Sequence, residues 1–536
     1  MADIAMPGSI EPAGRPNLES GFNPLTAIIF AGVIAAATLF VAYSIYSDID
    51  ASGQKVSSYL PFVLLFVALL VALGFEFVNG FHDTANAVAT VIYTHSLPAN
   101  FAVVWSGMFN LAGVLLSSGA VAFGIVSLLP VELILQVGSS AGFAMVFALL
   151  IAAIIWNLGT WYFGLPASSS HTLIGSVIGV GVTNALLHGR SGTSGVDFDQ
   201  ATSIGKALLL SPIFGFVLAA ILMVLVKLLV RNKELFAKPT GKEPPPPWIR
   251  GILVLTCTLV SFFHGSNDGQ KGMGLIMLIL IGVVPTAYAL NRSMPASQIA
   301  QFEANSQAAS AVIAAKAAGY SVIGDPRPAV TAYVAQRQIN EGTFPSLAVL
   351  VNEISKQVTQ YGSIAKMPTD TVSNTRNDMY LASEAIRFLS KDKESDLSAQ
   401  DIATLTAYKK SLDSATKFIP GWVKIVVAIA LGLGTMVGWK RIVITVGEKI
   451  GKTHLTYAQG ACAEITAAAT IAAADGYGLP VSTTHVLSSG IAGTMSANGS
   501  GLQWSTIRNI VMAWVLTLPA AMALSGALYF IFSHLF

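Results

Sequence analysis

Two short polar motifs interrupt long apolar stretches of this sequence, and each contains one aspartate. The motifs cover residues 79–90, with Asp83, and residues 264–272, with Asp268. A carboxylate inside apolar sequence of membrane length costs several kcal/mol unless it is paired, protonated or hydrated, so a functional role is the default interpretation. The alternative is a structural ion pair with a neighbouring histidine or lysine. Because the two aspartates recur at matching positions, we favour substrate and ion binding.

Two runs of hydroxyl side chains follow later in the chain, each just after a Gly-Leu-Pro sequence. Hydroxyls and the free backbone N–H groups of a helix start form a donor-rich end that can hold an anion. Ordinary helix capping is the alternative, but it accounts for one hydroxyl and leaves the rest without a purpose. The predicted anion-binding hydroxyls are Ser168, Ser169, Ser170, Ser482, Thr483 and Thr484.

A histidine follows each hydroxyl run, and a third lies beside the first aspartate. Histidine can carry a proton near neutral pH, although a buried histidine that is simply hydrogen-bonded is the commoner case. No metal site is predicted for the protein itself. The residues that the sequence predicts for the coupling ion are Asp83, Asp268, His82, His171 and His485.

Composition defines the class of protein that must position these residues. With 53% hydrophobic residues, 11% charged residues and a mean hydropathy of +0.65, the chain is predicted to be an all-α polytopic membrane protein. A net charge of +2 gives no support for a nucleic-acid partner. The chain contains no Gly-x-x-x-x-Gly-Lys-Ser/Thr motif, so nothing supports a nucleotide-driven pump and energy must come from an ion gradient.

Apolar runs, polar stretches and basic loops divide the chain into segments. A basic, proline-rich linker and a later basic cluster favour the cytoplasm by the positive-inside rule, which places the N-terminus inside and the long polar insertion outside. The predicted segments are 1–58 (tail and an extra span), 59–230 (first repeat), 231–250 (linker), 251–290 (start of the second repeat), 291–418 (insertion) and 419–536 (rest of the second repeat).

The two halves of the chain have the spacing of an internal duplication. Asp83 and His171 are 88 residues apart and Asp268 and His485 are 217 apart, and the polar insertion of 128 residues accounts for the difference. Each half has five apolar runs, so the second repeat is expected to be inverted relative to the first. With one leading span, about eleven crossings are predicted, with helices interrupted at the two motifs.

The motifs resemble those of the inorganic phosphate transporter (PiT) family, and their wording is similar to the bacterial low-affinity Pit branch. The resemblance covers about 59–290 and 420–534. It implies a symporter of the bacterial cytoplasmic membrane that imports inorganic phosphate by alternating access. It also implies no covalently bound cofactor, a neutral metal–phosphate complex as an alternative cargo, and a homodimer. The predicted substrate-binding residues are Asp83, Asn86, Ser168, Ser169, Ser170, Asn267, Asp268, Lys271, Ser482, Thr483 and Thr484.

One departure from the family pattern bears on the coupling ion. Sodium-coupled members carry an asparagine three residues after the aspartate in both halves, but here Asn86 is matched by Lys271. A fixed ammonium would occupy or repel a sodium site, so proton coupling is predicted and sodium is the alternative. The lysine is expected to pair with Asp268 or Asp83 when the site is empty.

Two other functions fit parts of the pattern. A permease for sulfate or another tetrahedral oxyanion would use the same hydroxyls, although carboxylate acceptors favour phosphate, which can donate a hydrogen bond. An intramembrane hydrolase would use Ser170, His171 and Asp83, but a serine and a histidine adjacent in sequence do not form the usual nucleophile-to-base geometry.

Overall fold

The computed structural model describes residues 16–18, 23–52, 59–83, 85–128, 139–190, 195–241, 243–317, 322, 324–362 and 364–535. Within these ranges the chain is helical and contains no β-strand, as the all-α prediction requires. Among the described residues, eight helical segments are long and apolar enough to cross a membrane, so the chain is a multi-pass membrane protein. They are α1 (Pro24–Ser52), α2 with α3 (Leu60–Asp83 and Ala85–Tyr93), α4 (Ala99–Leu116), α7 (Ser140–Tyr162), α8 (Ser169–Leu187), α9 (Phe198–Leu229), α10 (Pro247–Val283) and α21 (Trp504–Leu535).

This number is smaller than the eleven crossings that the sequence predicts. The three predicted crossings that fall short are α17 (Gly421–Thr435), α19 (Tyr457–Gly476) and α20 (Thr483–Ala497). Helices α17 and α20 have 15 residues each, or about 22 Å, which is less than the apolar core of a bilayer. Helix α19 is long enough, but Gln459, Glu464 and Asp475 lower its hydropathy. Three of the eleven predicted crossings are therefore shorter or less apolar than a full-length span.

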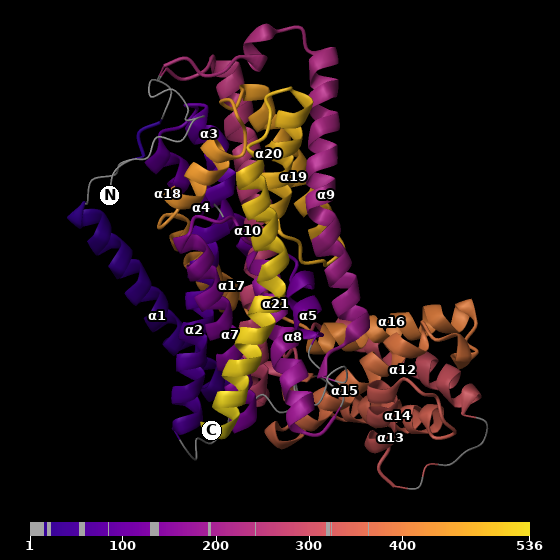
Figure 1. Cartoon of the computed structure of the whole chain (residues 1–536). Coiled ribbons are helices and arrows are strands. Elements are labelled where there is room, and N and C mark those ends of the chain that lie inside the picture. Colours follow the sequence, from indigo (N-terminus) through magenta and orange to yellow (C-terminus); the bar gives the residue numbers. More distant parts are fainter. Residues whose placement is uncertain are drawn as a thin grey trace.

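The two halves of the chain interlock through matching pairs of helices. Helix α8 packs against α21, and its counterpart α20 packs against α9. Likewise α4 packs against α10, and α17 packs against α2. Figure 1 shows the long helices side by side in one bundle. Each half therefore completes the packing of the other, as expected for a duplicated unit.

The chain breaks between helices at two matching loops rather than at the second polar motif. Helix α10 runs through residues 264–272 without interruption, so the predicted break there is wrong. The breaks follow α7 and α19, where Gly164 and Gly478 each adopt a left-handed conformation with φ of 66°. Only glycine takes up this conformation without strain, and it turns the chain into the Pro-containing loops before α8 and α20.

The insertion is a separate helical layer at one end of the bundle (Figure 1). It contains α12 (Ala296–Lys316), α13 (Arg327–Gln336), α14 (Thr343–Tyr361), α15 (Thr369–Leu389) and α16 (Ala399–Thr416). Large apolar side chains such as Phe302 and Leu347 are buried within it. Arg387 of α15 contacts Asp197, the N-cap of α9, at 2.5 Å and so ties the layer to the membrane helices.

The first helix, α1, is attached to the bundle mainly by its C-terminal end. Asp48 accepts hydrogen bonds from the hydroxyl of Tyr288 (2.6 Å) in α11 (Pro285–Tyr288) and from the indole of Trp422 (3.0 Å) in α17. Only 6% of the residues in its most apolar 18-residue stretch are buried, and Figure 1 shows its N-terminal end leaning away from the other helices. This geometry fits a lipid-facing extra span.

Candidate functional site

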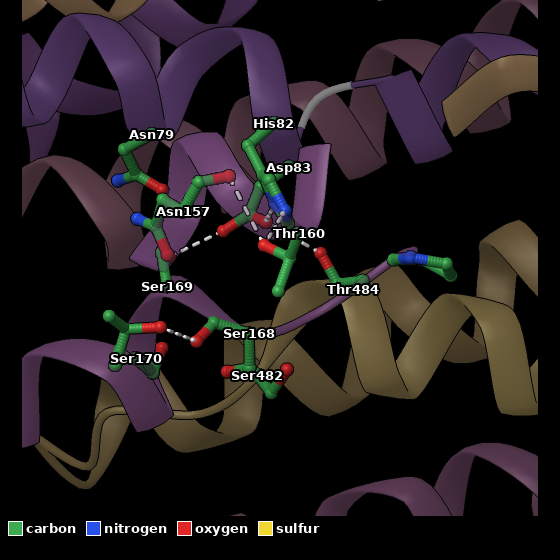
Figure 2. Close-up of polar contacts among 12 residues, drawn as sticks. Asn79, His82, Asp83, Asn157, Thr160, Ser168, Ser169, Ser170, Ser482 and Thr484 are labelled. Carbon is green, nitrogen blue, oxygen red and sulfur yellow. Dashed lines mark hydrogen bonds and ion pairs between the residues drawn. The ribbon is translucent and has the colours of Figure 1, made fainter. Parts of the chain in front are cut away.

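Asp83 lies at the C-terminal end of α2, where the two hydroxyl runs meet. Ser169, at the start of α8, donates a hydrogen bond to Asp83 Oδ2, and Thr484, at the start of α20, donates to Asp83 Oδ1 at 2.8 Å. Figure 2 shows these side chains converging on the carboxylate from two different helices. The structure therefore brings together the aspartate of the first half with one hydroxyl from each half.

The remaining hydroxyls divide between capping and linking roles. Ser168 and Ser482 accept hydrogen bonds from the backbone N–H of the following histidines at 3.1 Å, which makes them the N-caps of α8 and α20. Ser170 donates to the carbonyl of Val481 at 2.7 Å and so joins the two loops. The buried hydroxyl of Thr483 has no hydrogen-bond partner within the described residues. Capping thus accounts for one hydroxyl per run, as the sequence predicts.

Asp268 lies in α10 close to Asp83 and forms the second half of the cluster. Lys271 Nζ is 2.8 Å from Asp268 Oδ1, and both side chains are fully buried. This ion pair confirms the expected pairing of the lysine with an aspartate. A carboxylate oxygen of each aspartate and a ring nitrogen of His264 all lie within 4.8 Å of one another, a set of donors that could hold a divalent cation.

The histidines that were predicted to carry protons occupy two different places. His82 Nδ1 is 2.8 Å from Asp83 Oδ1, and its Nε2 is 3.1 Å from the hydroxyl of Thr160. The rings of His171 and His485 face each other with centroids 4.6 Å apart, and His485 stacks on Trp514 at 4.1 Å. His82 therefore contacts the aspartate cluster, whereas the rings of His171 and His485 contact each other and not the aspartates.

Asn267 holds the second loop in place. Its Nδ2 donates to the carbonyl of Leu479 at 3.2 Å, and its Oδ1 accepts from the N–H of Val481 at 3.4 Å. The side chain of Asn86 lies outside the described residues, so the predicted match with Lys271 is not described at the level of contacts.

Three further acidic side chains were not selected from the sequence. Glu76 in α2 and Glu464 in α19 are fully buried, and Asp475 at the end of α19 accepts from Ser266 (2.7 Å) and Gln270 (2.6 Å) of α10. Glu464 accepts hydrogen bonds from the hydroxyls of Thr90 and Thr256. A carboxylate within apolar sequence is the signal that selects Asp83, and it would also have selected these three residues. None of them has an acidic residue at the matching position of the other half.

The family model described as "Phosphate transporter family" matches residues 79–525 of this chain, which include the whole cluster. The chain belongs to the phosphate transporter family. Among its relatives, the low-affinity inorganic phosphate transporter PitA of Escherichia coli (strain K12) is 44% identical over 88% of this chain and 96% of its own length. PitB of the same strain is 42% identical over the same shares. The low-affinity inorganic phosphate transporter of Buchnera aphidicola subsp. Acyrthosiphon pisum is 41% identical over 91% of this chain and 98% of its own.

A solved structure, "The sodium-dependent phosphate transporter", is similar at 20% identity over 88% of this chain and all of its own, with a TM-score of 0.48. The curated relatives are named as transporters, so the chain is assigned to a transporter family and not to an enzyme family. The geometry agrees with this assignment. The hydroxyl of Ser170, the candidate nucleophile of a hydrolase, donates to a backbone carbonyl.

Proposed function

We propose that this chain imports inorganic phosphate together with protons. The charge of the buried cluster carries the proposal. Asp83 and Asp268 bring two carboxylates to one site, and among the described residues one lysine, Lys271, pairs with Asp268 there. Two carboxylates and one ammonium give these three side chains a net negative formal charge before any anion enters. A further anion in this low-dielectric site is unfavourable unless cations enter with it, and this favours symport.

Protons suit the cluster better than sodium ions. Lys271 already places a fixed cation on Asp268, so this carboxylate is paired without a sodium ion. Protonation of an aspartate or a histidine needs no additional space. A divalent metal that enters as a neutral complex with phosphate would neutralise the same charge, and it forms the second part of the proposal.

Phosphate is the anion that the donors and acceptors suit best. The hydroxyl of Thr483 and the N-terminal ends of α8 and α20 supply donors, and the hydroxyls of Ser169 and Thr484 would have to turn from Asp83 to the anion to add two more. The carboxylate of Asp83 can accept a hydrogen bond from a protonated phosphate oxygen, which sulfate lacks near neutral pH. The names of the relatives agree with phosphate.

Transport would proceed by alternating access between two inverted repeats. The exchange of helices between the halves supports this, because α8 packs on α21 while α20 packs on α9. In this proposal the site lies where the two repeats meet, the N-terminus is in the cytoplasm and the insertion is outside. The membrane is the bacterial cytoplasmic membrane, as the positive-inside rule and the resemblance favour.

Uptake of radiolabelled phosphate by proteoliposomes tests the proposal. We expect accumulation when only an inward proton gradient is imposed, and none when only a sodium gradient is imposed at equal pH on both sides. Addition and removal of divalent metal tests the metal–phosphate complex, and excess sulfate tests the anion. Strong accumulation with a sodium gradient alone would contradict proton coupling, and efficient competition by sulfate would contradict the choice of anion.

A further inference from the structure

Glu76 is a fully buried carboxylate of α2 that lies outside the two polar motifs. It precedes Asp83 by seven residues, or two helical turns, so the two carboxylates lie on one face of α2 about 10 Å apart along its axis. Asn79 lies between them on the same face and is also fully buried. The helix therefore presents a line of three polar side chains that leads away from the site.

The polar atoms along this line are incompletely satisfied. Asn79 Nδ2 donates a long hydrogen bond of 3.5 Å to Glu76 Oε2, and Glu76 Oε1 has no partner within the described part of the chain. The same holds for Asn79 Oδ1 and for both amide atoms of Asn157 in α7. Figure 2 shows Asn79 and Asn157 beside the Asp83 cluster. Buried polar groups are nearly always hydrogen-bonded, so a set of this size indicates a path for water or protons.

Glycine makes room for the carboxylate on the facing helix. A β-carbon added at Gly272 of α10 would overlap the side chain of Glu76. Glu76 thus lies over the backbone directly after Lys271. This contact places it next to the lysine of the site while it remains two turns from Asp83.

Within the described part of the chain, no cation forms an ion pair with Glu76. On α10, Lys271 and Asp268 are the charged groups whose fields reach it, and Lys271 Nζ is 2.8 Å from Asp268. Helices α3 and α7 contain no charged residue, and His171 is the one titratable residue of α8. Lys424, the one charged residue of α17, donates to the carbonyl of Ser117. Burial disfavours a charged carboxylate, so the field of Lys271 is what keeps Glu76 ionised while the site is empty.

We propose that Glu76 binds the proton that travels with phosphate. When phosphate enters the cluster, its negative charge attracts the ammonium of Lys271. The positive field of this ammonium at Glu76 then becomes weaker. The carboxylate of Glu76 then takes up one proton to become a carboxylic acid, and it releases that proton when phosphate leaves. Phosphate and proton each raise the affinity for the other, as linkage requires. This inference rests on the proposed proton symport.

The test compares wild-type protein with Glu76→Gln in proteoliposomes that contain a pH-sensitive dye. In wild type, external phosphate should drive proton influx. In the variant, exchange of labelled for unlabelled phosphate at equal pH should persist, whereas proton influx should fall by about tenfold and accumulation should lose its dependence on the proton gradient. Glu76→Asp, which keeps an ionisable group, should restore proton influx. Proton influx in Glu76→Gln within twofold of wild type would overturn the inference.

Two further results separate this inference from the proposed function. If wild type itself shows no phosphate-driven proton influx, proton symport fails and Glu76 has no coupling role. A second measurement covers variants that do not fold: a hydrophobic carbodiimide, which reacts with protonated carboxyls, is applied to wild-type protein and the modified residue is identified by mass spectrometry. We expect modification at Glu76 that declines as the pH rises. An unmodified Glu76 under conditions that support uptake would overturn the inference.

Discussion

At the scale of single residues, the site depends on hydroxyls that differ in role although they are adjacent in sequence. Ser168 caps α8, Ser169 donates to Asp83, and Ser170 donates to the opposite loop. A helix places consecutive side chains about 100° apart, so three neighbours cannot face one ligand together. Substitutions at neighbouring positions should therefore have different effects.

The first prediction concerns Ser169. Ser169→Ala removes a hydrogen bond to a charged group, which is worth about 1.5–3 kcal/mol. We expect initial phosphate uptake to fall by about tenfold, with normal expression. Ser176→Ala is the matched control, because the hydroxyl of Ser176 is also buried in α8 but donates to the carbonyl of Thr172 at 2.8 Å. Similar uptake in the two variants would contradict a role for Ser169 at the site.

The second prediction concerns Lys271. Lys271→Asn leaves Asp268 buried without its cation, and the loss of one partner of a buried ion pair costs about 3–5 kcal/mol. Phosphate uptake should fall by tenfold or more, and the residual uptake should become dependent on sodium. Lys424→Asn provides a control, since this lysine contacts the carbonyl of Ser117 away from the cluster. Residual uptake that ignores sodium would contradict the exclusion of sodium by the ammonium.

At the scale of helices, the insertion is fastened to the bundle at the start of α9. Asp197 caps this helix by accepting from the N–H groups of Asp199 (3.1 Å) and Gln200 (3.2 Å), and it also contacts Arg387. Burial raises the pKa of Asp197, but the hydrogen bond and charge of Arg387 outweigh burial and hold the pKa below its ordinary value. Asp197 thus both caps α9 and holds the insertion against the bundle.

The third prediction separates the cap from the ion pair. Asp197→Asn keeps an N-cap of equal quality but removes the charge that holds Arg387. Amide exchange in α15 should become about tenfold or more faster, because a hydrogen bond to a charged group is lost. Hydrogen-exchange mass spectrometry measures this, with Asp199→Asn as control, since Asp199 is exposed. Equal exchange in both variants would show that the contact does not hold the layer.

The same contact has a predictable pH dependence. The folded pKa of Asp197 lies below its unfolded value, so its stabilising effect is fully present at neutral pH and is lost only as the pH falls through the folded pKa. Titration of Asp197 should therefore leave the docking of α15 on the bundle unchanged between about pH 5 and 8. A loss of docking in that range would point to a different titrating residue.

At the scale of the whole molecule, the insertion and the bundle share one continuous apolar core, but the insertion lies apart from the aspartate cluster. Side chains such as Phe302 and Leu347 are buried among the insertion's own helices, whereas the aspartate cluster lies among α2, α8, α10 and α20. Among the described residues, none of the hydrogen bonds of the cluster and its two loops comes from α12 to α16. The insertion is therefore not needed to build the site.

The fourth prediction is that transport survives without the insertion. Deletion of about 295–415, with a short flexible linker between the ends, should leave proteoliposome uptake of phosphate within about threefold of the full-length rate, because loop-closure free energy changes slowly with length. Size-exclusion chromatography in detergent checks that the deleted protein is folded. A folded, correctly inserted variant with no uptake would make the insertion part of the mechanism.

The sequence by itself determined the class of protein, the all-α architecture and the duplicated motifs, because hydropathy and repeat spacing are properties of the chain alone. It also selected Asp83, Asp268 and the hydroxyl runs, since polar groups in apolar sequence are costly wherever they occur. An ion pair of Lys271 with Asp268 or Asp83 was also predicted, and the structure shows the pair with Asp268.

Only the tertiary structure decided which of these residues meet. Thr484 reaches Asp83 across 401 positions of sequence, and no local pattern encodes such a contact. The continuous path of α10 through its motif depends on the helices packed around it, which override the local weakness of glycine. Glu76 became a candidate in the same way: its single position in the sequence carries no repeat signal, and its burial over Gly272 exists only when α2 and α10 lie side by side.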